Sequence, residues 1–394
     1  MRYYTNPNIS YFAKTNFRSD GKRFGIRQTD RLMHTYILGK TGSGKTNLLT
    51  TLILQDIQHL RGCCIFDVHG DLLRNIQKHI PKYRVKDVIL LDVADPLLEF
   101  RYNPLRKVSI EKRSLVVAGL LDSFHMLWRS AWGVKLEHIL RYILLTLLSI
   151  PKSDLSDIPR IIHDKSFRES VISHIDSKEI ITFWKDEFPK YTKNDIVPIL
   201  NKVGAFLAHP ALKRFLVTNP NDISLRQCMD TSKVVLIDLS KGRLGKDAAH
   251  LIGSILITSF AHASFSRIDT EEDHREPFHI FLDEFHNYTT PSITGMLSEL
   301  RKFKISLTLA NQYISQLDND IKNAVLGNVG TLISFRLGQQ DAKYMAQAFY
   351  PEFESTDFTL LENYSIYLSL MINGRPSKPF SADTIPYIDI LAPP

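Results

Sequence analysis

Residues 33–47 read MHTYILGKTGSGKTN, a short apolar run followed at once by a glycine-rich turn. Further apolar runs at residues 63–66 and 88–91 are typical of buried strands. Because strands and helices alternate, the sequence predicts an α/β fold in which helices cover a parallel sheet. The first of these helices follows the turn, where apolar residues recur with a 3.6-residue period at Leu48, Leu49, Leu52, Ile53 and Ile57.

The composition is that of an ordinary globular protein. Of 394 residues, 44% are hydrophobic and 23% charged, while 18 glycines and 18 prolines exclude collagen-like and low-complexity chains. The net charge of +7 is compatible with a nucleic-acid partner and equally with a slightly basic enzyme. The three cysteines form no C-x-x-C pair, which favours a reducing cytoplasm over a disulfide framework.

The middle of the chain changes character. From about residue 109 to 231 the pattern is helical, and all three tryptophans (Trp128, Trp132 and Trp184) fall there. Strand-like runs resume at residues 234–238, 278–282, 305–309 and 332–335, and residues 367–380 predict a hairpin on a sheet edge with Asn373-Gly374 as its turn. We therefore expect residues 1–107 and 231–394 to form the α/β core, and residues 108–230 an inserted all-alpha domain.

No membrane segment is expected. The start of the chain is polar and lacks the apolar stretch of a signal peptide. The best apolar run, Ile143–Ile150, is far shorter than the roughly 20 residues that span a bilayer. The sequence thus predicts a cytoplasmic protein that reaches a membrane only through partners.

The glycine-rich turn matches the phosphate-binding pattern G-x-x-x-x-G-K-[ST] at every position. Glycines let backbone N–H groups close around a phosphate, and the following helix adds the positive end of its dipole. In this pattern Lys45 binds the β- and γ-phosphates, and the Thr46 hydroxyl binds Mg²⁺. The sequence predicts binding of ATP and Mg²⁺ through Gly39, Lys40, Thr41, Gly42, Ser43, Gly44, Lys45, Thr46 and Asn47.

A pair of carboxylates, Asp283 and Glu284, follows the apolar run at residues 278–282. We expect Asp283 to hold the Mg²⁺ shell and Glu284 to polarise the attacking water, a general-base task that needs a carboxylate beside the γ-phosphate. The stretch Asp67-Val68-His69-Gly70-Asp71 also follows a predicted strand. We expect it to be a loop near the nucleotide and not a metal site, because no other His/Cys cluster supports one.

Three further polar residues are candidates for nucleotide hydrolysis. Gln312, at the end of a predicted strand, either senses the γ-phosphate or simply closes the strand. Arg301 either reaches the nucleotide of a neighbouring subunit or is a solvated helix end, and Arg336 is a second candidate for that arginine. The predicted catalytic set is therefore Lys45, Glu284, Gln312 and Arg301.

These motifs together resemble the HerA–FtsK superfamily of ring-forming DNA pumps, and within it the conjugative coupling proteins of type IV secretion. The resemblance covers nearly the whole chain. The N-terminal transmembrane helices of membrane-bound coupling proteins are not expected in this sequence. The residues that carry it are Phe24–Ile26, Asp30, Arg31, His34, Gly39–Thr46, Asp67, His69–Asp71, Asn103–Leu105, Asp238–Gly242, Leu282–Phe285, Asn311, Gln312, Asn328–Thr331, Phe335, Arg336, Asp341 and Ala342.

The resemblance implies a RecA-like P-loop ATPase core with an all-alpha insertion, working as a homohexameric ring. It implies Lys45 and Thr46 as Walker A residues, Asp283 and Glu284 as Walker B, Gln312 as the sensor and Arg301 as the trans-acting arginine. The expected substrate is DNA bound without sequence preference, with relaxase or secretion-channel proteins as partners. Two alternatives stay open, namely a secretion-assembly ATPase that acts on proteins, and a nucleotide-binding scaffold without turnover.

Overall fold

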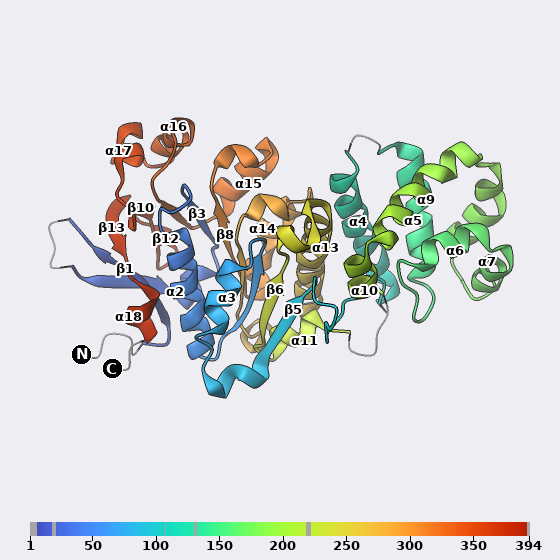
Figure 1. Ribbon diagram of the computed structural model, residues 1–394, viewed down its shortest axis with the longest axis horizontal. Coiled ribbons are helices and arrows are strands. Elements are labelled where there is room, and N and C mark those ends of the chain that lie inside the picture. The colour runs from blue at the N-terminus through green and yellow to red at the C-terminus, as the bar shows by residue number, and fades with distance from the viewer. Residues whose placement is uncertain (1–5, 18–20, 107, 130–131, 218–221, 392–394) are drawn as a thin grey trace. The chain divides into compact units, whose positions relative to one another are not determined.

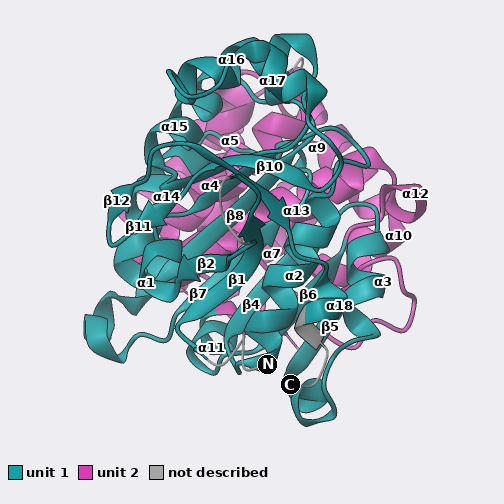
Figure 2. Ribbon diagram, turned by 90° about the vertical axis from the view of Figure 1, so that its left-hand side faces the viewer, with its two compact units in different colours: residues 1–90, 226–238, 264–394 teal, residues 91–225, 239–263 magenta. Residues whose placement is uncertain are grey.

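The computed structural model describes residues 6–17, 21–106, 108–129, 132–217 and 222–391. The chain forms two compact units, shown in different colours in Figure 2. The first comprises residues 1–90, 226–238 and 264–394, and the second comprises residues 91–225 and 239–263. The sequence-based division at residues 107/108 and 230/231 stays a prediction, and residue 107 itself lies outside the described residues.

A large sheet dominates the first unit (Figure 1). Within the described residues it has eleven strands in the order β2-β1-β13-β10-β9-β3-β8-β7-β4-β6-β5. The consecutive strands from β9 to β6 are parallel, which confirms the predicted α/β fold. The strands are β1 (Ile9–Thr15), β2 (Arg23–Arg27), β3 (Thr35–Leu38), β4 (Gly62–Asp67), β5 (Val88–Asp92), β6 (Val234–Asp238), β7 (Phe278–Leu282), β8 (Ile305–Asn311), β9 (Thr331–Ser334), β10 (Ser365–Ser369) and β13 (Phe380–Thr384).

The parallel register brings four strand ends to one edge of the sheet. Leu38, the last residue of β3, lies opposite Asn311 of β8, and Leu282 of β7 lies opposite Phe66 of β4. Polar residues follow each of these ends in sequence. The sheet therefore gathers the glycine-rich turn and the predicted carboxylates at the same edge, as expected for ligand sites in parallel α/β sheets.

Helix α2 (Lys45–Gln58) carries the turn into the core. All five apolar positions of its predicted stripe are buried. It packs on β1 and β4 and contacts two other helices of the first unit, α3 (Asp71–Gln77) and α18 (Tyr387–Leu391). The helices of this unit are α1 (Gln28–Arg31), α2, α3 (Asp71–Gln77), α11 (Leu225–Asp230), α14 (Ile293–Glu299), α15 (Asn319–Asn328), α16 (Gln339–Ala348), α17 (Ser355–Leu360) and α18 (Tyr387–Leu391).

The antiparallel part of the sheet differs from the prediction. The polar N-terminal segment contributes β1 and β2, two strands that the sequence did not predict. The predicted edge hairpin is not at an edge, because β10 lies between β9 and β13. The turn itself is confirmed: Asn373 and Gly374 both have positive φ and join β11 (Met371–Ile372) to β12 (Arg375–Pro376). Asp30 fixes it by accepting hydrogen bonds from both turn N–H groups.

Helices make up most of the second unit. Trp184 is buried there, and its Nε1 donates to Thr146 Oγ1 at 2.8 Å. Helix α9 (Lys193–Ala208) begins with a capping box between Thr192 and Asp195. The helices are α4 (Ile110–Leu127), α5 (Val134–Leu147), α6 (Asp157–His163), α7 (Lys165–Ile172), α8 (Lys178–Thr182), α9 (Lys193–Ala208), α10 (Pro210–Leu216), α12 (Lys241–Leu244) and most of α13 (Lys246–Phe265).

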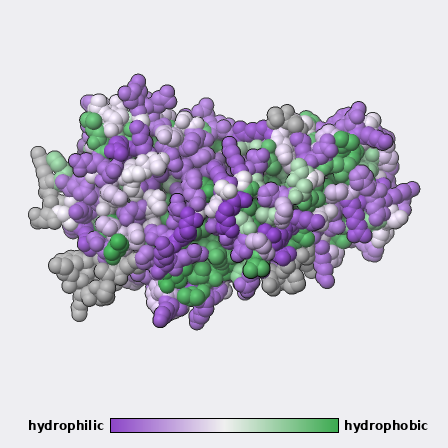
Figure 3. All heavy atoms as spheres, in the orientation of Figure 1, coloured by the Kyte–Doolittle hydropathy of each residue, from purple (hydrophilic) through white to green (hydrophobic). Residues whose placement is uncertain are grey.

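Among the described residues, one stretch is long and apolar enough to cross a membrane, Lys246–Asp269. Most of its apolar window (78%) is buried, and the core helix of a globular protein meets the same criterion. On the face drawn in Figure 3 most side chains are hydrophilic, and apolar ones gather in several places, one of them in the region of β5. Val85 and Leu90, before and within this edge strand, are exposed.

Candidate nucleotide-binding site

The glycine-rich turn lies between β3 and α2, as predicted. Two of its glycines have the positive φ that favours glycine, Gly42 at 76° and Gly44 at 123°. A Cβ atom at Gly44 would also lie 2.9 Å from Cε1 of Phe335, so no other residue fits there without a shift. The Lys40 N–H donates to the Arg336 carbonyl at 3.0 Å. Strand β9 thereby holds the turn from the side opposite β8.

Lys45 is buried at the start of α2. Its ammonium donates to the carbonyl oxygens of Gly39 and Lys40 within the turn. Burial lowers the pKa of Lys45, and the negative charges of Glu284 and Asp283 oppose that effect. The lysine and the two predicted carboxylates thus lie close enough to interact.

The two carboxylates follow β7, and both are buried. Asp283 Oδ1 accepts from the Glu284 N–H at 3.1 Å, and Glu284 has a left-handed backbone with φ of 51°. Burial raises the pKa of Asp283 to about 7, and the charges of Glu284 and Asp67 act in the same direction. Negative charge is therefore concentrated here, which favours a bound cation.

The donor set suits Mg²⁺ held partly by a phosphate. The described residues contain no group of three or more His, Cys, Asp or Glu side chains arranged to hold a metal ion. Mg²⁺ commonly takes one or two carboxylates together with waters and substrate phosphates, and not a closed protein cage. A carboxylate at Asp283 and a hydroxyl at Thr46, both lining one cleft, fit that pattern.

Gln312 connects β8 to the turn. Its Oε1 accepts a hydrogen bond from Thr41 Oγ1 at 2.9 Å. Beside it, His286 links the neighbouring strand ends, with its Nδ1 3.6 Å from Glu284 Oε2 and 3.3 Å from Asn311 Nδ2. His286 was not predicted from the sequence, although it lies only two residues after Glu284. A polar chain of side chains thus runs between the ends of β7 and β8.

One cleft of about 450 Å³ is lined by the turn, Lys45, the two carboxylates and Gln312. It contains most of the predicted site residues and the loop that follows β4, which confirms the expectation that this loop lies near the predicted nucleotide site. Tyr364, also in the lining, was not predicted, because nothing in its neighbourhood in the sequence indicates a site. The lining residues are Thr41, Gly42, Gly44, Lys45, Thr46, Asn47, Asp67, His69, Asp71, Leu72, Asp283, Glu284, Gln312 and Tyr364.

The two candidate arginines lie outside this lining. Arg301 precedes β8, so it sits at the opposite end of that strand from Gln312, and its Nη1 contacts Met33 Sδ at 2.8 Å. Arg336 follows β9 and is half-buried. Neither position assigns a role, and both stay predictions.

His34 ties the segment that carries Arg301 to the start of β3. Its Nδ1 accepts from the Leu307 N–H at 3.0 Å, and its Nε2 lies 2.9 Å from the Leu297 carbonyl oxygen. Burial lowers the pKa of His34 to about 4, so a neutral ring that donates from Nε2 satisfies both contacts at pH 7. His34, which directly precedes β3, thereby contacts α14 and β8, the two elements that flank Arg301 in the sequence.

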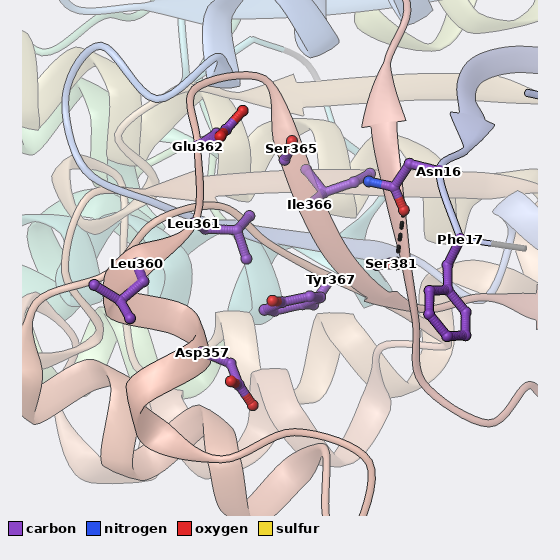
Figure 4. Close-up of a pocket in the computed structure, with 10 residues that line it drawn as sticks. All are labelled: Asn16, Phe17, Asp357, Leu360, Leu361, Glu362, Ser365, Ile366, Tyr367 and Ser381. Atoms are coloured by element: carbon purple, nitrogen blue, oxygen red, sulfur yellow. Dashed lines mark hydrogen bonds between the residues drawn. The ribbon is translucent and has the colours of Figure 1, made fainter.

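A second hollow of about 360 Å³ opens on the same unit (Figure 4). Figure 4 shows the hydrogen bond that Asn16 Oδ1 accepts from Ser381 Oγ, and Phe17 and Leu360 lie on opposite sides of the hollow. Its lining contains no lysine or arginine and no part of the glycine-rich turn. The cleft at the end of β3 is therefore the candidate nucleotide site.

Comparison with solved structures finds the same fold over almost the whole chain. The bacterial conjugative coupling protein TrwBdeltaN70 matches with a TM-score of 0.65 and 14% identity, over 96% of this chain and 94% of that chain. The plasmid coupling protein TrwB in complex with ADP and Mg²⁺ has a TM-score of 0.64 and 13% identity, over 96% and 95%. VirB4 of Thermoanaerobacter pseudethanolicus has a TM-score of 0.66 and 14% identity, over 98% and 99%. These likenesses confirm the predicted RecA-like fold.

Comparison with curated protein sequences finds no match. Two family models do match. The model for the TraM recognition site of TraD and TraG covers residues 277–349. The model for the central domain of helicase HerA covers residues 28–259, more than half of the chain and including the whole glycine-rich turn. By that match, and in agreement with the resemblance of its motifs, the chain belongs to the HerA helicase central-domain family.

Proposed function

We propose that this protein is an ATPase motor that moves DNA in conjugative or mobile-element transfer, or in DNA processing. One observation carries the proposal: a single cleft holds Lys45, the Asp283–Glu284 pair and the Gln312 side chain bonded to the turn. These are the groups needed to bind a triphosphate and to hydrolyse it. A scaffold that only holds nucleotide has no need of the second carboxylate.

Each residue has a distinct task in this proposal. Lys45 leaves the turn carbonyls to bind the β- and γ-phosphates. Glu284 orients and deprotonates the attacking water. Gln312 contacts the γ-phosphate and transmits its presence to the turn through the hydrogen bond with Thr41. Mg²⁺, held by Thr46 and Asp283, would neutralise phosphate charge.

The proposed substrate is DNA, bound through its phosphates and hence without sequence preference. The family description, the coupling-protein likeness and the net charge of +7 support this assignment. We further propose a homohexameric ring, because Arg301 lies away from the cleft of its own chain and an arginine acting in trans needs a neighbour. Relaxase or secretion-channel proteins are the proposed partners, with a cytoplasmic location and membrane contact through them.

The deciding measurement is the rate of ATP hydrolysis with and without single- and double-stranded DNA at about 0.15 M salt. We expect DNA to raise the rate of ATP hydrolysis, and we expect this increase to depend little on the base sequence of the DNA. Apparent DNA affinity should fall log-linearly with salt concentration, because each phosphate contact releases counterions. Lys45→Ala should abolish hydrolysis, and Lys86→Ala, at an exposed position outside the cleft, controls for loss of one positive charge.

Binding of DNA alone does not decide the question, since a basic protein-secretion ATPase also attracts a polyanion. Coupling decides it. If a confirmed hexamer hydrolyses ATP and neither form of DNA changes the rate, the alternative of a secretion-assembly ATPase replaces the DNA motor. If Lys45→Ala hydrolyses ATP normally, the nucleotide-site assignment itself is wrong.

A further inference from the structure

Tyr364 is an aromatic residue of the cleft that none of the proposed steps uses. It lies directly before β10, lines the same cleft as Lys45 and Thr46, and is 53% exposed. A Cβ atom at Gly44 would lie 3.1 Å from Cδ1 of Tyr364. The ring therefore rests against the turn, beside Gly44.

The backbone of Tyr364 is held firmly in an unusual conformation. Its φ is 70°, a left-handed value that is rare for a bulky residue. Its N–H donates to the Ser43 carbonyl at 2.8 Å, and its own carbonyl accepts from both Thr384 N and Thr384 Oγ1. Residues kept in such conformations by surrounding contacts cluster at ligand clamps. The three hydrogen bonds fix the point from which the ring projects.

The order of strands indicates which end of a nucleotide Tyr364 meets. Around the turn the order is β10-β9-β3-β8-β7. Asp283 and Glu284, which mark the γ-phosphate end, follow β7 on one side of β3, whereas Tyr364 precedes β10 on the other side. In this motif the backbone N–H groups of the glycine-rich turn hold the α- and β-phosphates, and the lysine reaches the β- and γ-phosphates. The nucleoside must then leave on the side away from the carboxylates.

The chain that follows β13 is hydrogen-bonded to the first turn of α2. Asn47, in the first turn of α2, donates to the Ile385 carbonyl at 3.1 Å and accepts from the Tyr387 N–H at 3.4 Å. Both polar atoms of its amide are thus engaged with the backbone. What this side offers a ligand is chiefly the aromatic face of Tyr364.

We propose that the Tyr364 ring is the stacking platform for the nucleobase of the bound nucleotide. This inference rests on the proposed nucleotide site and adds the group that recognises the base. Every nucleobase presents a π-face, so stacking on one aromatic ring favours nucleotides over bare polyphosphate without choosing strongly between adenine and guanine. The phosphates are held by the turn, and the base is held by Tyr364.

The test compares three ligands, ATP, GTP and inorganic tripolyphosphate, by calorimetric titration in the presence of Mg²⁺. Tyr364→Leu keeps an apolar side chain and removes the π-face. It should weaken ATP and GTP alike by about 5- to 150-fold, the range for loss of one base–aromatic stack, and leave tripolyphosphate affinity unchanged. Tyr364→Phe should bind all three as the unchanged protein does. Tyr83→Leu is the matched control, because Tyr83 is 56% exposed and lies outside the cleft.

A second readout needs no variant. The triphosphate of 2-aminopurine riboside should lose fluorescence when it binds the unchanged protein, because stacking quenches this base. Bound 2-aminopurine nucleotide that keeps its full fluorescence would overturn the proposal. So would an equal loss of ATP and tripolyphosphate affinity in Tyr364→Leu, which would assign Tyr364 to support of the turn alone. If the unchanged protein binds neither ATP nor tripolyphosphate, the proposed function fails with it; tripolyphosphate binding without a base effect refutes only the stacking.

Discussion

Glu284 carries the catalytic part of the proposal at the scale of a single residue. Its left-handed backbone turns the chain sharply at the end of β7 and leaves its side chain buried in the cleft beside Lys45. A non-glycine residue pays conformational energy for such a backbone, roughly 1–3 kcal/mol. That cost is consistent with a side chain placed for chemistry.

Glu284→Gln should bind ATP and hydrolyse it at least about 100-fold more slowly, because the amide keeps the shape and loses the base. Single-turnover hydrolysis and nucleotide titration of the same sample separate the two effects. Glu362→Gln is the control, since Glu362 is an exposed glutamate outside the cleft lining. Normal turnover in Glu284→Gln together with a dead Asp283→Asn would move the base to another carboxylate.

Local sequence identified the residues of the site that belong to a motif. Lys45 was found because its glycine-rich turn directly follows an apolar strand, and the carboxylate pair was found because it directly follows another. The parallel register then brings the strand ends together. Tyr364 could not be found this way. Backbone hydrogen bonds to Ser43 and Thr384 hold Tyr364 beside the cleft. Both partners are distant in the sequence, so the residues around Tyr364 do not indicate them.

Helix α2 is the element that joins the phosphate site to the antiparallel edge of the sheet. Strand β1 pairs with β13 only over the residues from Ala13 to Thr15. Just before that stretch, the Gln55 amide accepts from Tyr11 N at 2.8 Å and donates to Tyr11 O at 2.6 Å. The side chain thus supplies the donor and acceptor that a neighbouring strand would supply.

Gln55→Leu should lower the free energy of unfolding by roughly 1–3 kcal/mol, because it removes the two hydrogen bonds between the amide and the Tyr11 backbone. Denaturant unfolding monitored by circular dichroism measures the change. Gln58→Leu, in the last turn of the same helix, should cost far less, since the Gln58 side chain makes no hydrogen bond within the described residues. Equal losses in the two variants would show that the amide contacts with β1 add nothing.

Elements with a strong apolar run were predicted well, and those without one were not. The predicted bounds of β6 and β7 match those observed, because their side chains are buried almost throughout. Strands β1 and β2 alternate buried and exposed positions imperfectly, with a register shift between Tyr11 and Ala13. Strand β10 was placed at an edge because a hairpin turn does not reveal which strand will pair with its outer side.

At the scale of the whole assembly, Arg301 provides the test of a ring. Arg301→Ala should lose hydrolysis by about 1,000-fold or more and keep nucleotide affinity, because its charge acts on the transition state in a neighbouring subunit. Lys302→Ala, the adjacent exposed residue, is the charge-matched control and should stay active.

Mixing Arg301→Ala with Lys45→Ala should restore part of the activity, since some interfaces then pair an intact turn with an intact arginine. The readout is ATP turnover against mixing ratio, with mixed rings confirmed by native mass spectrometry. Absence of rescue at every ratio would point instead to Arg336, or to an arginine that acts within its own chain.

The strand order has a consequence for how the molecule is made. Strand β3, which leads into the phosphate-binding turn, is flanked by β8 and β9, and Asn47 is bonded to Ile385, 338 positions away. A nascent chain that has emerged from the ribosome only as far as α13 carries the whole turn but neither strand that flanks β3. Such high contact order slows folding. Nucleotide should therefore bind only after β13 has docked, and by mass action it then stabilises completed molecules over partly folded ones.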